Sequence, residues 1–163
     1  VNFGVESPLV VNAMLASSGI GIMIGAFISG RKSLNFIRVN NIYTGSTMIT
    51  ICAILVPIVS SLSFIPNSSA LIIVTAVILL FGVGAGMMIV PLNALMQAHS
   101  PEDGLGSMLA GKNWLQNIAM IGLLALTMLL AKLSFDSQFI LYLNAAIAVV
   151  GFTIVLKKLK TIL

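Results

Sequence analysis

Charge is the property that this sequence has least of, since only 7% of its 163 residues are Asp, Glu, Lys or Arg. A water-soluble domain carries about 25% charged residues. Here 59% of the residues are hydrophobic and the mean hydropathy is +1.14. So few charges cannot cover a surface that faces water. The composition therefore excludes an ordinary soluble domain and predicts an integral membrane protein.

Cysteine and histidine are almost absent, with one residue of each, Cys52 and His99. A single cysteine cannot form an intrachain disulfide, so no disulfide framework holds the fold. Cys52 lies inside an apolar run, where we interpret it as a small buried hydrophobe. His99 stands in a short polar break, where a solvated turn is the simplest interpretation. We therefore expect no enzyme activity, no metal site and no cofactor.

Five long apolar runs make up most of the chain. A membrane-spanning helix needs about 20 mostly apolar residues, and each run is long enough. The runs are continuous, whereas barrel strands would alternate apolar and polar residues. Only helices or closed barrels satisfy the backbone within hydrocarbon. We predict an all-α membrane protein with five transmembrane helices, at about residues 9–28, 36–64, 69–97, 104–133 and 138–156.

Basic residues gather in two of the breaks. Arg31, Lys32 and Arg38 follow the first run, and three lysines stand in 157–160. Cytoplasmic segments carry an excess of Lys and Arg, so both segments are expected in the cytoplasm. With five spans, the N-terminus is then outside and the C-terminus inside. Membrane orientation explains the net charge of +4 better than nucleic-acid binding does.

Glycines crowd the first and third runs, at Gly19, Gly21 and Gly25 and again at 82, 84 and 86. A nucleotide-binding glycine loop needs a strand before it, and these glycines lie inside predicted membrane helices. Small residues instead allow membrane helices to approach closely. We expect packing roles for Gly82 and Gly86, and a kink at Pro91.

Polar side chains cluster at the start of the fourth run, in "GSMLAGKNWLQNIAM". At 100° per residue, Asn113, Gln116 and Asn117 share one face, with Lys112 at its edge. On the preceding run, one face is shared by Thr75, Gly82, Gly86, Asn93 and Gln97. The two helices are expected to be antiparallel neighbours, with one polar seam along both.

Polar groups in hydrocarbon usually face a bundle interior or a wet cavity. The seam is therefore a candidate cavity wall, with Asn93, Lys112, Asn113, Gln116 and Asn117 as candidate binding residues. Two plainer interpretations stay open. In the first, the amides join helices by hydrogen bonds; in the second, Lys112 extends its ammonium to the headgroups.

Two stretches carry a resemblance to known transporters. "GRKS", with Gly25, Gly30, Arg31 and Lys32, resembles the cytoplasmic loop signature of the major facilitator superfamily. The acidic residue that is usual in that signature is missing here, and Ser29 is nearby instead. The runs "GVGAGMMIVPLNALMQ" and "GSMLAGKNWLQNIAM" are similar to the bacterial lysophospholipid transporter family of that superfamily. The matching residues are Pro91, Asn93, Gln97, Gly106, Asn113 and Asn117. Lys112 and Gln116 depart from it, since the family has glutamine and glutamate there.

The resemblance implies that the five runs are helices eight to twelve of a twelve-helix transporter in the bacterial inner membrane. The sequence would then be a C-terminal fragment that lacks the N-terminal half. The implied substrate is a lysophospholipid, moved by alternating access to the inner leaflet, where an acyltransferase is a possible partner. Membrane lipid is the surrounding partner. The alternatives are another solute or drug transporter of the superfamily, or the membrane domain of a lysophospholipid acyltransferase fusion.

Overall fold

The computed structural model describes residues 8–32, 39–61, 67–101 and 104–162, and all regular structure within them is α-helical. The helices are α1 (Pro8–Lys32), α2 (Val39–Ser61), α3 (Asn67–Ala98), α4 (Leu105–Lys132) and α5 (Ser137–Ile162). All five are long and apolar enough to cross a membrane. The prediction of an all-α membrane protein with five spanning helices is confirmed.

Helix α1 continues beyond its expected end. We predicted a break from position 29, but Ser29, Gly30 and Arg31 lie in the last turn of the helix. A cation in the last turn is favourable because the carbonyl end of a helix is negative. The Arg31 guanidinium also lies over the Phe27 ring, 4.9 Å from its centroid. The two ends of the predicted second span, residues 36–38 and 62–64, lie outside the described residues.

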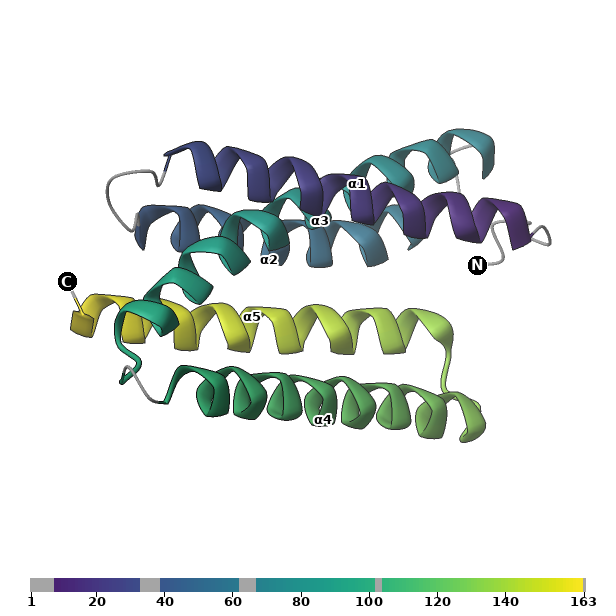
Figure 1. Ribbon diagram of the computed structural model, residues 1–163. Coiled ribbons are helices and arrows are strands. Elements are labelled where there is room, and N and C mark those ends of the chain that lie inside the picture. The colour runs from purple at the N-terminus through teal and green to yellow at the C-terminus, as the bar shows by residue number, and fades with distance from the viewer. Residues whose placement is uncertain (1–7, 33–38, 62–66, 102–103, 163) are drawn as a thin grey trace.

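Helices α1, α2 and α3 form one packed group, in which α3 packs against both of the others. Helix α5 packs against α2, and α4 runs beside α5 at the edge of the molecule (Figure 1). The N- and C-termini lie at opposite ends of the helices. None of the residues of α4 is buried. The core of the fold therefore lies around α3, and α4 is left open on most of its surface.

Glycines set the distance between α1 and α3. Gly21 and Gly25 on α1 face Gly82 and Gly86 on α3, and a Cβ atom at any of the four would collide with the opposite backbone. A Cβ at Gly86, for example, would lie 2.6 Å from the Ala26 nitrogen. Lipid tails are as apolar as leucine, so membrane helices associate through close packing of this kind.

We expect Gly25→Val to destabilise the protein, because the new side chain would enter the α3 backbone at Val83 and Met87. Overpacking of a tight contact typically costs about 1–3 kcal/mol. Gly19→Val is the matched control on the same helix, since a Cβ there has nothing within 4 Å. Thermal unfolding in lipid nanodiscs measures the effect. Equal melting temperatures for the two variants would contradict glycine-dependent packing.

Candidate functional site

Asn93 of α3 and Lys112 of α4 are joined directly. The Lys112 ammonium donates a hydrogen bond of 2.6 Å to Asn93 Oδ1, across 19 residues of sequence. Lys112 is half-buried. Charged groups within spanning segments usually face the bundle interior and pair with polar groups there. The ammonium is thus turned towards α3, which differs from a lysine that only reaches for headgroups.

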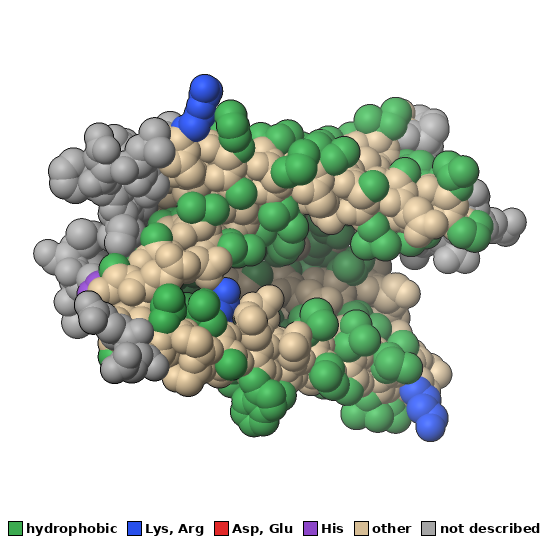
Figure 2. Space-filling view, viewed as in Figure 1, with side chains coloured by type: hydrophobic (Ala, Val, Ile, Leu, Met, Phe, Trp, Pro, Cys, Tyr) green, Lys and Arg blue, Asp and Glu red, His purple; other side chains and the backbone are tan. Residues whose placement is uncertain are grey.

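A cavity of about 440 Å³ lies at this junction. Asn93, Lys112, Asn113 and Gln116 line it, together with Ile89 and Leu92. Figure 2 shows this face of the molecule hollowed between the upper helices and the α4–α5 pair, with a basic side chain at the wall of the hollow. One part of the lining is polar or cationic and another is aliphatic. Such a wall can bind a molecule that is itself polar at one end and apolar at the other.

The amide groups of Asn113 and Gln116 remain available to a ligand. Both side chains are exposed at the cavity. Neither one forms a hydrogen bond with another described residue of the chain. A side-chain amide offers two donors and one acceptor. The cavity wall therefore presents one cation and two unpaired amides within the same hollow.

Asn117 lies on the same helix one turn further on, since it follows Asn113 by four residues. Its side chain is exposed, but it is not among the residues that line the cavity. The structure thus brings together four of the five candidate binding residues and leaves Asn117 beside them. Sequence reasoning missed the aliphatic wall of Ile89 and Leu92, although their spacing of four and one from Asn93 placed them near it.

The polar seam that we predicted along α3 and α4 is restricted to one part of the two helices. Gly82 and Gly86 face α1, so that part of the α3 face is closed by packing. The hydroxyl of Thr75 donates to the carbonyl of Leu71 in its own helix, at 2.8 Å, and the Thr127 hydroxyl does the same towards Leu124. Apart from α5, α4 has no extensive helix contact within the described chain. The polar region is therefore local to the Asn93–Lys112 junction.

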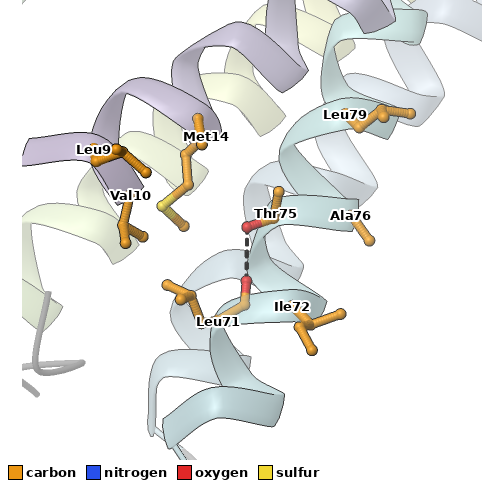
Figure 3. A pocket seen from close by; sticks show the side chains of 9 residues that line it. Leu9, Val10, Met14, Leu71, Ile72, Thr75, Ala76 and Leu79 are labelled. Atoms are coloured by element: carbon orange, nitrogen blue, oxygen red, sulfur yellow. Dashed lines mark hydrogen bonds between the residues drawn. The ribbon is translucent and has the colours of Figure 1, made fainter. Parts of the chain in front are cut away.

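A second hollow of about 440 Å³ lies between the first turns of α1 and α3. Figure 3 shows Leu9, Val10 and Met14 of α1 across it from Leu71 and Thr75 of α3. Among the described residues that line it, Thr75 alone carries a hydroxyl, which is bonded to Leu71 (Figure 3). The described part of this wall offers no group that would hold a charged or strongly polar ligand. The junction of Asn93 and Lys112 is thus the better candidate for substrate binding.

The relatives of this chain include lysophospholipid transporters of Yersinia. The lysophospholipid transporter LplT of Yersinia pestis (strain Pestoides F) is 30% identical over 128 residues, which are 78% of this chain and 28% of the relative. The protein of the same name from Yersinia pseudotuberculosis serotype O:3 (strain YPIII) matches to the same extent. No family model and no solved structure matches. The chain is thus similar over most of its length to a part, just over a quarter, of a lysophospholipid transporter.

Proposed function

We propose that this chain is part of a transporter that moves lysophospholipids across the bacterial cytoplasmic membrane by alternating access. The observation that carries the proposal is the cavity at the Asn93–Lys112 junction, which is cationic on one side and aliphatic on the other. The similarity to lysophospholipid transporters supports the same substrate class.

A lysophospholipid has an anionic phosphate, a polar glycerol and a single acyl chain. The Lys112 ammonium is bound to a neutral amide oxygen, and none of the described residues places a carboxylate in an ion pair with it. Attraction between an ammonium and a phosphate is much stronger in a low-dielectric site than in water. Asn113 and Gln116 can donate hydrogen bonds to the phosphate or the glycerol hydroxyl. We assign Ile89 and Leu92 to the first part of the acyl chain.

The cavity needs a second wall to close. Because no residue of α4 is buried, its exposed face is available for helices outside this sequence. In transporters built from repeats, the substrate lies between two such parts, which rock around it. We propose that the five helices correspond to helices eight to twelve of a twelve-helix transporter, and that the N-terminal half covers α4.

Lys112→Gln should lower uptake of lysophosphatidylethanolamine and lysophosphatidylglycerol by the intact transporter. A hydrogen bond to a charged group is worth about 1.5–3 kcal/mol, which corresponds to about a tenfold or larger loss. Lys132→Gln is the matched control, since Lys132 is an exposed lysine at the other end of the same helix. Radiolabelled uptake is measured per copy of transporter in the membrane. Equal uptake by the two variants would exclude a phosphate contact at Lys112.

Alanine substitutions of Asn113 and Gln116 should each weaken apparent affinity about two- to tenfold, because a neutral hydrogen bond is worth about 0.5–1.5 kcal/mol. Asn117→Ala should have a smaller effect, because Asn117 lies beside the cavity and does not line it. Protein abundance should stay unchanged. Uptake is measured over a range of substrate concentrations, with Thr127→Ala on the same helix as the control. Reduced abundance with normal affinity would instead indicate that these amides join helices.

Orientation can be tested with single cysteines in a Cys52→Ser background. The segment between the fourth and fifth helices is expected outside the cell, and the segment between the third and fourth helices is expected inside. Ser137→Cys should therefore react with an impermeant thiol reagent on intact cells. His99→Cys should react only after the cells are opened. Both positions are exposed in the structure, so access across the membrane decides the labelling. The reverse pattern would overturn the proposed orientation.

A further inference from the structure

Pro91 leaves one carbonyl of α3 without its helical partner. In an α-helix the carbonyl of residue i accepts from the N–H of residue i+4. Proline has no N–H, so the carbonyl of Met87 cannot be satisfied within α3. Pro91 is among the most completely buried residues of the protein, and this part of α3 belongs to a spanning segment. Within hydrocarbon there is little water to take the place of the lost donor.

Ser29 of α1 supplies the missing donor. Its hydroxyl donates a hydrogen bond of 3.3 Å to the Met87 carbonyl, and its side chain is fully buried. Asn41 of α2 is also buried and donates from Nδ2 to Ser29 Oγ at 3.1 Å. The Ser29 hydroxyl thus accepts from the Asn41 amide and donates to the Met87 carbonyl, and these two bonds fix its direction. Three helices meet in this one chain of hydrogen bonds.

The short reach of serine requires the close approach of α1 and α3. Gly25 lies one turn before Ser29, and a Cβ on Gly25 would stand 3.0 Å from the Met87 nitrogen. The glycine contact therefore brings the two backbones to the distance at which a serine hydroxyl meets the carbonyl.

The Met87 carbonyl lies just before the α3 residues of the candidate cavity. Those residues, Ile89, Leu92 and Asn93, lie on either side of Pro91 in the sequence, and Asn93 binds Lys112. A helix that lacks one hydrogen bond at a proline bends easily there. The hydrogen bond from Ser29 to the Met87 carbonyl, which we call the brace, limits that bending. It thereby limits the directions in which Asn93 can point.

We infer that Ser29 and Asn41 are positioning residues, which replace the hydrogen bond lost at Pro91 and thereby hold the α3 wall of the candidate cavity in place. The inference rests on the proposed function only in treating that cavity as a substrate site. The brace itself is a statement about geometry, and its tests need no transport.

The first test is a double-mutant cycle on the thermal stability of the intact protein. Ser29→Ala should lower the melting temperature by several degrees. In a Pro91→Ala background the same change should have a clearly smaller effect, because the N–H of residue 91 again reaches the Met87 carbonyl and only Asn41 loses a partner. Ser17→Ala is the control, since Ser17 is buried on the same helix but donates to Met14 within it, at 2.6 Å. Equal losses in both backgrounds would overturn the brace.

The second test measures the cavity itself. Asn93→Cys and Gln116→Cys are combined with Cys52→Ser, and a short bifunctional thiol reagent joins the two positions that line the cavity. The yield per folded protein should fall about two- to tenfold with Ser29→Ala, as expected for the loss of one or two buried hydrogen bonds, and should not change with Ser17→Ala. An unchanged yield with Ser29→Ala, alongside a coupled stability cycle, would show that Ser29 stabilises the bundle without positioning the cavity.

Discussion

The contact between the backbones of α1 and α3 is the constraint on which the rest of the structure depends. Without water between them, helices in lipid gain little from burying apolar side chains against each other. Gly21, Gly25, Gly82 and Gly86 replace that driving force with close packing. The contact fixes the middle of α3, around Gly82 and Gly86, against α1, and it brings Ser29 to the carbonyl that Pro91 leaves open. The direction of the last turns of α3 follows from both.

The candidate cavity lies where α3 passes beyond this packing. Upstream, small residues close the face of α3 against α1; downstream, Asn93 is free to meet Lys112 of α4. An ammonium within a spanning helix is costly, and the amide oxygen of Asn93 relieves only part of that cost because it carries no charge. We propose that a phosphate-bearing lipid uses the remaining positive potential. The protein thus combines a rigid, apolar region with one polar site at its edge.

The length and continuity of the apolar runs were enough to predict five spanning helices, because the hydrocarbon thickness sets how long such a run must be. The polar cluster at Lys112 and Asn113 was also visible, since polar residues stand out in so apolar a run, although the sequence left helix joining and headgroup contact open as other roles for it. The face of α3 was predicted less well. A rotation of 100° per residue shows which residues share a face of one helix, but it does not show which neighbouring helix packs on that face. Gly82 and Gly86 were therefore grouped with Asn93, although they face α1. The bond from Ser29 to Met87 joins positions 58 residues apart and leaves no periodic signal.

The central claim is that the Lys112 ammonium meets the phosphate of a lysophospholipid. Solid-state NMR can measure it directly in the intact protein, through dipolar coupling between ¹⁵N-labelled lysine side chains and the phosphorus of bound lysophosphatidylethanolamine. The account predicts a coupling of direct-contact strength that disappears in Lys112→Gln and persists in Lys132→Gln. A bound substrate whose phosphorus shows no coupling to lysine nitrogen, or a coupling that survives the loss of Lys112, would contradict it.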